Sequence, residues 1–290
     1  MTNSNVSLDD KYSIESGRIF VTGVQALARI PMVQRQRDVL EGLNTAGFIS
    51  GYRGTQVGGF YKQMWRAKKF LEQNHIRFQP GLNEDLAASA IWGSQQTNLH
   101  EGGKYDGVFA IWYGKGPGVD RCGDVFKHGN MSGPAKHGGV LLIAGDDHAA
   151  KSSTVPHQSE YAFMDASIPV LNPAGLQDIV DYGILGFAMS RFSGCWVAFK
   201  TTAENMDSSA SIDVSPDRVK ISLPKFDMPE GGLSIRWPDD WIEQEHRLHQ
   251  YKLNAVRAFA RQNKIDKTII NSQNPKLGVV TTGKSYLDVR

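Results

Sequence analysis

Residues 107–118 read GVFAIWYGKGPG, an apolar run that ends abruptly in a glycine-rich polar loop. Two other stretches have the same form: residues 45–60, TAGFISGYRGTQVGGF, and residues 139–154, GVLLIAGDDHAAKSST. This is the pattern of a strand buried on both faces of a parallel sheet, followed by the loop at its carboxyl end. Because ligands of α/β domains collect at those carboxyl ends, we expect the polar loop residues to face a common site.

The rest of the first 200 residues alternates between predicted helices and strands. Residues 18–30 are the predicted opening helix, and Pro31 is expected to end it. Further helices are predicted at 60–74, 84–98 and 176–190, and strands at 48–50, 108–112, 140–144, 168–171 and 196–200. This alternation predicts an α/β fold with a doubly wound, mainly parallel sheet that has helices on both faces.

The character of the sequence changes after about residue 211. Residues 212–238 are expected to form a linker or hairpin, and Asp239-Asp240 then caps a long amphipathic helix over 241–262. Residues 275–283, PKLGVVTTG, are predicted to be a strand and turn that open a second α/β domain. We therefore divide the chain into residues 1–215, a linker and helix over 216–270, and the truncated start of a second domain over 271–290.

Composition sets the broad class of the protein. With 290 residues, of which 40% are hydrophobic and 21% charged, the chain can bury a sizeable core. A formal net charge of +2 gives no reason to expect a nucleic-acid or membrane-surface partner. No apolar run approaches the roughly 18 residues that a membrane helix needs. Two cysteines are too few for a zinc or iron–sulfur site of about four ligands, so we expect a cytoplasmic chain without a metal site.

The leading catalytic candidate lies at the start of the predicted 84–98 helix. Residues 83–90 read NEDLAASA, so Glu84 follows a Pro80-Gly81 turn and precedes small residues that let a flat ligand come close. The helix dipole favours a carboxylate at this position, and a carboxylate beside apolar residues suits proton-transfer chemistry. From these residues alone, a simple charge in the cap region is the commoner explanation.

Taken together, these segments resemble the amino-terminal, pyrimidine-binding domain of indolepyruvate ferredoxin oxidoreductases, which are thiamine-diphosphate-dependent 2-oxoacid:acceptor oxidoreductases. The resemblance runs from residues 6–12 to residues 277–283. It rests on the order and spacing of the 51–59 glycine loop, Asn83-Glu84, the GKGPG of 114–118, and the GDD of 145–147 followed by Ser152-Ser153. It implies a thiamine-diphosphate-binding pyrimidine domain over 1–215 and a transketolase C-terminal-like domain beginning at 271.

The resemblance implies roles for single residues. Glu84 is then the catalytic glutamate, which bonds the aminopyrimidine ring of thiamine diphosphate. The expected cofactor-binding residues are Gly51, Tyr52, Gly54, Glu84, Lys115 and Gly116, and the expected substrate contacts are Arg53, Thr55 and Arg121. Arginine suits a carboxylate through its bidentate fork. A turn held by its glycines is the alternative for the 51–59 loop, and solvated surface is the alternative for Lys115 and Arg121.

Several other chemistries do not fit the motifs. The 51–59 loop lacks the Gly-Lys-Ser/Thr ending of a P-loop and the Gly-x-Gly-x-x-Gly of a dinucleotide site. Asp146, Asp147 and His148 are adjacent, and adjacent residues rarely ligate one metal ion together. The chain contains no Gly-x-Ser-x-Gly, the nucleophile elbow of many hydrolases.

The resemblance implies oxidative decarboxylation of indolepyruvate, or another arylpyruvate, to an acyl-CoA, with ferredoxin as electron acceptor. The cofactor of this family lies between two domains, and the motifs for magnesium, diphosphate and iron–sulfur clusters are not in this sequence. We therefore expect the amino-terminal portion of a longer, homodimeric enzyme that uses a 2-oxoacid, coenzyme A and ferredoxin, with no turnover by this portion alone. The alternatives are a non-catalytic folding and dimerisation fragment, and a thiamine-diphosphate enzyme for other 2-oxoacids.

Overall fold

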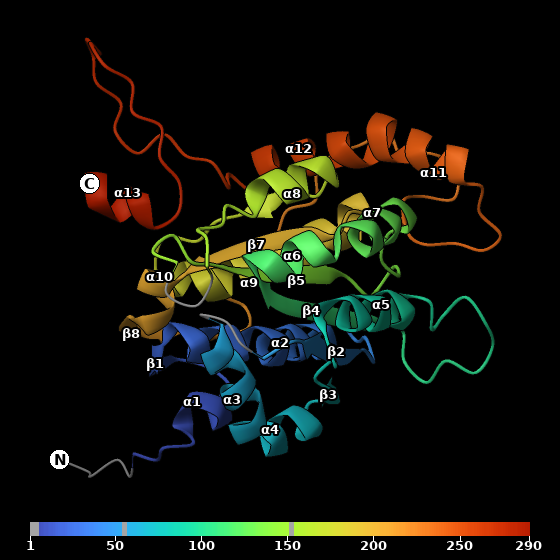
Figure 1. Ribbon diagram of the computed structural model, residues 1–290, viewed down its shortest axis with the longest axis horizontal. Coiled ribbons are helices and arrows are strands. Elements are labelled where there is room, and N and C mark those ends of the chain that lie inside the picture. The colour runs from blue at the N-terminus through green and yellow to red at the C-terminus, as the bar shows by residue number, and fades with distance from the viewer. Residues whose placement is uncertain (1–5, 54–56, 151–153) are drawn as a thin grey trace.

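A parallel sheet forms the centre of the computed structural model, which describes residues 6–53, 57–150 and 154–290 (Figure 1). The strand order is β3 (Ile76–Phe78), β2 (Ala46–Gly51), β4 (Val108–Lys115), β5 (Val140–Asp146), β7 (Val197–Thr202) and β6 (Val170–Leu171). Every neighbouring pair is parallel, and the carboxyl ends are nearly level because Lys115 pairs with Gly145 and Asp146 with Thr202. The predicted α/β fold with a mainly parallel sheet is confirmed.

Both faces of this sheet are covered by helices, because β4 and β5 are apolar on both sides. On β4, Phe109, Ile111 and Tyr113 join one core cluster, and the alternate residues Ala110 and Trp112 join the other, as the period of two in a strand requires. The first cluster includes residues of α2 (Gly23–Leu40), α3 (Gly58–Arg66), α9 (Leu176–Ser193) and α12 (Leu253–Gln262). The second includes residues of α5 (Glu84–Gln95), α6 (Gly116–Arg121), α7 (Gly123–Ser132) and α8 (Glu160–Asp165).

The remaining elements lie around these layers. A small antiparallel sheet pairs β1 (Arg18–Thr22) with β8 (Ser209–Asp213). The predicted 241–262 helix is confirmed as α11 (Trp241–Arg247), a π-helical turn η1 (Leu248–Lys252) and α12, which packs against α9. The other helices are α1 (Asp10–Ser13), α4 (Lys68–Gln73), α10 (Ala203–Asp207) and α13 (Lys284–Val289). No helix in the described ranges is long and apolar enough to span a membrane.

The prediction for the first 40 residues was wrong at both ends of the opening helix. Residues 18–22 form β1, because β8 offers them a partner strand, so part of the predicted 212–238 linker is also a strand. Helix α2 begins at Gly23 and continues through Pro31 to Leu40. An internal proline costs roughly 3 kcal/mol, but every residue from Ala26 to Arg35 is buried, so packing outweighs that cost.

Two further predictions differ from the structure. The predicted 60–74 helix is divided at Ala67 into α3 and α4. Residues 275–282 form no strand. They are almost entirely exposed, in the segment that extends from the body of the molecule before α13, and no described strand pairs with their backbone (Figure 1). An isolated strand leaves its backbone hydrogen bonds to water and is not stable. The division into 1–215, 216–270 and 271–290 stays a prediction.

Candidate active site

Backbone hydrogen bonds place Glu84 at the carboxyl edge of the sheet. After β3 the chain follows β2 to its end, where the Gln79 and Gly81 amides donate to β2 carbonyl oxygens at 2.9 Å. Helix α5 then begins at Glu84, and the side chain of Asn83 caps it by accepting from the backbone amide of Leu86 at 2.8 Å. The indole Nε1 of Trp112, on β4, donates to the carbonyl oxygen of Glu84 at 3.1 Å. The first residue of α5 is therefore held against β2 and β4.

The Glu84 side chain is buried, although it is charged. Glu84 is 7% exposed and lies against the first turn of α6. A Cβ added at Gly118 would lie 2.7 Å from Glu84 Cγ and 3.0 Å from Oε1, so only glycine leaves room for the carboxyl group. Among the residues that the structure describes, none makes a hydrogen bond or an ion pair with this carboxylate. Its oxygen atoms are not among the fully buried atoms that lack a partner, so they reach the surface at this edge, where a ligand could bond them.

Four other predicted residues come to the same edge. Gly51 ends β2, and a Cβ there would lie 2.2 Å from the carbonyl oxygen of Tyr113, so the strands approach closely. The Tyr52 amide donates to that same oxygen at 3.3 Å. Lys115 ends β4 and is partly buried, and Gly116 begins α6. Their position agrees with a cofactor-side role, which stays a prediction.

The predicted substrate residues are less closely gathered. Arg53 is exposed, two residues after the end of β2. Arg121 lies at the far end of α6, where its Nε is 3.7 Å from Asp85 Oδ2 and both side chains are largely solvated. Gly54 and Thr55 lie outside the described residues. The substrate roles of these residues stay predictions.

A buried charged cluster at the same edge was missed by the sequence analysis. Asp146, at the end of β5, is fully buried, accepts hydrogen bonds from the amide and hydroxyl of Ser159 at 3.0 and 2.5 Å, and lies 3.4 Å from Lys200 Nζ. Lys200, on β7, also pairs with Glu160. Burial, the largest single influence, raises the pKa of Glu160, but the hydrogen bond and charge of Lys200, together with a backbone hydrogen bond and the charge of His148, outweigh it, so the pKa is lowered. The cluster ties Ser159 and Glu160 to the ends of β5 and β7, and its only signal in the sequence is a lysine in an apolar strand.

Comparison with known proteins supports the resemblance. No family model matches the chain. Indolepyruvate oxidoreductase subunit IorA of Pyrococcus abyssi is 24% identical over 161 residues, and that of Pyrococcus horikoshii is 23% identical over 161 residues. Each match covers 53% of this chain and 24% of the relative, so the chain spans about a quarter of the length of the curated relatives it matches.

The fold is shared with a solved structure. The 2-oxoglutarate:ferredoxin oxidoreductase from Magnetococcus marinus, with 2-oxoglutarate, coenzyme A and succinyl-CoA bound, has a TM-score of 0.55 and 15% identity. The match covers 83% of this chain and 45% of that one. The chain resembles the 2-oxoacid:ferredoxin oxidoreductases. This confirms the resemblance predicted from the sequence, and at such identity the structural match is evidence for the fold alone.

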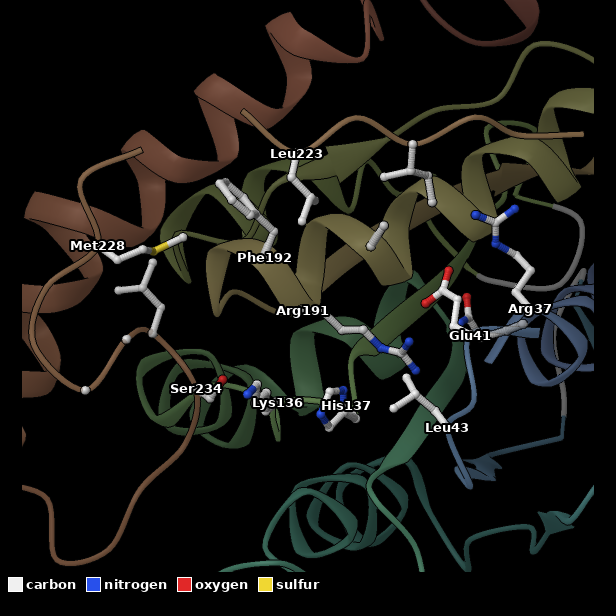
Figure 2. Close-up of a pocket in the computed structure, with 16 residues that line it drawn as sticks. Arg37, Glu41, Leu43, Lys136, His137, Arg191, Phe192, Leu223, Met228 and Ser234 are labelled. Carbon is white, nitrogen blue, oxygen red and sulfur yellow. The ribbon is translucent and has the colours of Figure 1, made fainter. Parts of the chain in front are cut away.

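A cavity lies at the opposite edge of the sheet. It has a volume of about 750 Å³, and residues such as Leu43 and His137, which precede β2 and β5, line it (Figure 2). Phe192 of α9 and Leu223 and Met228 of the following linker form its apolar wall (Figure 2). This cavity is at the amino ends of the strands, whereas α/β sheets bind their ligands at the carboxyl ends. We therefore do not take it as the candidate active site.

Proposed function

We propose that this chain is the amino-terminal, pyrimidine-binding portion of a thiamine-diphosphate-dependent 2-oxoacid:ferredoxin oxidoreductase. The observation that carries the proposal is Glu84, a residue only 7% exposed whose carboxyl group has no partner among the described residues, at the carboxyl edge of a parallel sheet, where α/β domains bind ligands. The similarity to indolepyruvate oxidoreductase subunits favours indolepyruvate, or another arylpyruvate, as the substrate of the complete enzyme. We also infer a cytoplasmic location and a homodimeric state from the family resemblance.

The Glu84 carboxyl group suits a ring nitrogen of an aminopyrimidine. An ionised carboxylate only accepts hydrogen bonds, so a ring nitrogen that carries a proton is a fitting partner for it. The neighbouring positions have small side chains or none: Gly51, Gly116 and Gly118 at the strand and helix ends, and the buried Ala87 and Ala88 in the first turns of α5. The Cβ directions of the three glycines are filled by Tyr113, His157 and Glu84, so these positions bring the strand and helix ends close together at this edge.

The roles of this chain's own groups follow from that fit. When bound, thiamine diphosphate supplies an electron sink for the carbanion that decarboxylation of a 2-oxoacid leaves. Glu84 would hold a proton at the N1′ atom of the aminopyrimidine ring, as a general acid–base group. Gly51, Tyr52, Gly54, Lys115 and Gly116 would line the cofactor, and Arg53, Thr55 and Arg121 would orient the substrate carboxylate. We assign the contacts to diphosphate, magnesium, coenzyme A and ferredoxin to other parts of the longer protein.

Replacement of Glu84 in the complete enzyme tests the proposal. Glu84→Gln keeps the shape of the side chain but cannot hold the proton, so turnover should fall by at least a factor of about 10² to 10⁴. Asp124→Asn is the matched control, because Asp124 is also a first-turn carboxylate but is almost fully exposed on α7. Near-normal turnover by Glu84→Gln, with its unfolding midpoint unchanged, would refute the role of Glu84.

The substrate is a separate question. The solved structure with a similar fold holds 2-oxoglutarate, which favours a second candidate, an enzyme that acts on an aliphatic 2-oxoacid. A panel that compares kcat/KM for indolepyruvate, phenylpyruvate, pyruvate and 2-oxoglutarate, with ferredoxin as acceptor, separates the two. We expect the arylpyruvates to be preferred. A preference for 2-oxoglutarate would replace the arylpyruvate assignment and leave the cofactor assignment in place.

A further inference from the structure

The first turn of α6 is held between two side chains. Gly116 and Gly118 are two positions apart in this helix, so at about 100° per residue they lie on nearly opposite faces. A Cβ added at Gly116 would lie 2.2 Å from Cβ and Cγ of His157, while one at Gly118 would lie 2.7 Å from Cγ of Glu84. A single helical turn, whose two glycines admit close contact, therefore separates His157 from the candidate catalytic group.

Both ends of α6 contact the His157 ring. The ring packs on Gly116 at the start of the helix, and its Nε2 lies 3.1 Å from Oδ2 of Asp120 near the helix end. Its Nδ1 faces the carbonyl oxygen of Val155 at 3.2 Å, which fixes the plane of the ring. The His157 side chain is 15% exposed, whereas that of Asp120 is 59% exposed. The imidazole is thus held in one orientation against α6. Its partner Asp120 is exposed, so it can be replaced without disturbing the core.

The surroundings make this arrangement rigid. Two residues after His157, Ser159 is anchored to the buried Asp146 through its amide and its hydroxyl. On the inner side of α6, Val119 is fully buried in the core cluster that contains Trp112. The helix is therefore packed against the core on its inner side and against the anchored segment around His157 on the other. Any change at His157 is passed on to the backbone against which the Glu84 carboxyl group lies.

We infer that His157 is a positioning residue for Glu84, acting through the first turn of α6. The inference rests on the proposed function, because the position of the Glu84 carboxyl group matters for catalysis only if Glu84 contacts the cofactor. His157 holds Gly118 against the Glu84 side chain and so sets the direction of the carboxyl group. Without the His157 ring, α6 can shift into the space that the ring fills beside Gly116, and the Glu84 carboxyl group can then turn toward the space that α6 leaves.

Four variants of the complete enzyme test this. His157→Ala removes both the ring and its hydrogen bond, His157→Phe keeps a ring beside Gly116, and Asp120→Asn weakens only the polar contact. The control is His128→Ala, because His128 also faces an aspartate, Asp124 at 3.6 Å, but does so on α7. The readouts are calorimetric binding of thiamine diphosphate, amide hydrogen exchange over residues 116–121, and kcat and KM for the 2-oxoacid.

For His157→Ala we expect the affinity for the cofactor to fall on the order of tenfold or more, because even a small displacement of a contacting group has a large effect. Exchange should rise over residues 116–121 and not elsewhere, and kcat should fall more than the KM for the 2-oxoacid rises. His157→Phe and Asp120→Asn should lie between wild type and His157→Ala, and His128→Ala should match wild type.

Glu84→Gln, measured in parallel, separates the two claims. If it is inactive while all His157 and Asp120 variants bind the cofactor with wild-type affinity, the positioning role is overturned and the proposed function stands. If exchange rises along the whole chain in His157→Ala, and His157→Phe and Asp120→Asn bind the cofactor like wild type, His157 serves general stability and the inference fails. If Glu84→Gln is active, the proposed function fails, and the positioning role fails with it.

Discussion

Lys252 offers a prediction whose magnitude follows from the structure. This lysine lies in the π-helical turn η1 and is 1% exposed. Its Nζ donates to the carbonyl oxygens of Asn130 and Met131, at 3.1 and 2.7 Å, near the carboxyl end of α7. Burial lowers the pKa of Lys252 from its ordinary 10.5 to about 8. The chain thus carries the cost of holding a cation in its interior at neutral pH.

The sign of the pH dependence follows from this lowered pKa. Below about pH 8 the lysine is protonated in both the folded and the unfolded chain. Between about pH 8 and 10.5 the unfolded chain still binds the proton that the folded chain has lost, so the free energy of unfolding rises with pH. A gap of about 2.5 pH units, at 1.36 kcal/mol per unit, makes the full contribution of this group about 3 kcal/mol.

Urea denaturation of the chain with Lys252 and of Lys252→Met, at pH 7 and pH 10, measures this contribution. Burial also raises the pKa of Cys195 to about 11 and that of Tyr12 to about 12, and both groups reduce stability as the pH rises. Tyr12 is common to both proteins and cancels, but Cys195 and Lys252 influence each other's pKa, so both proteins carry Cys195→Ala and the difference between them then isolates Lys252. The protein that retains Lys252 should gain about 2 to 3 kcal/mol relative to the Lys252→Met variant between the two pH values. Parallel pH profiles would refute the reasoning.

Three other outcomes are expected. Gly118→Ala in the complete enzyme puts a Cβ 2.7 Å from Glu84 Cγ, and a displacement of about 1 Å should lower kcat on the order of a hundredfold; wild-type kcat would count against the contact. Arg191→Met leaves the buried Asp38 carboxylate without its bidentate partner and should lower the free energy of unfolding, measured by urea titration, by about 3 kcal/mol or more. The double variant with Arg191→Met and Asp38→Asn should recover most of that loss, because no unpaired charge is left buried. The Cys195 thiol, fully buried and with its pKa raised to about 11, should react with iodoacetamide only as fast as the chain unfolds, and rapid native labelling at pH 8 would contradict its burial.

The sheet could be predicted from the sequence because its signal is local. A run such as residues 108–113 is apolar at every position, and only a strand covered on both faces requires that. The course of α2 could not be predicted in the same way. Pro31 disfavours a helix locally, and the burial that outweighs it depends on α9, about 150 residues further along the chain. Strand β1 likewise needs β8, its partner from residues 209–213.

The candidate site was predictable to a similar extent. Glu84 stands out because an acidic residue after a turn, at the start of a small-residue helix, is visible within a few positions. His157 and Lys200 do not stand out, because their significance comes from partners 37 and 40 residues away, Asp120 and Glu160. Gly118 was part of a recognised motif, but only the structure shows that a side chain there would meet the Glu84 carboxyl group.

The two edges of the sheet differ in electrostatics, and this decides which one suits an anionic substrate. At the amino edge, Arg37 and Arg191 lie in the last turns of α2 and α9, where cations complement the negative end of a helix. Arg37 donates to linker carbonyl oxygens, and Arg191 is paired with Asp38, so the cavity in Figure 2 has arginines already occupied by the fold. At the carboxyl edge, α5 begins, so the positive end of its dipole faces the candidate site, where the proposed function would put an anionic 2-oxoacid. The size of a cavity is therefore a poorer guide in this chain than the direction of its strands and helices.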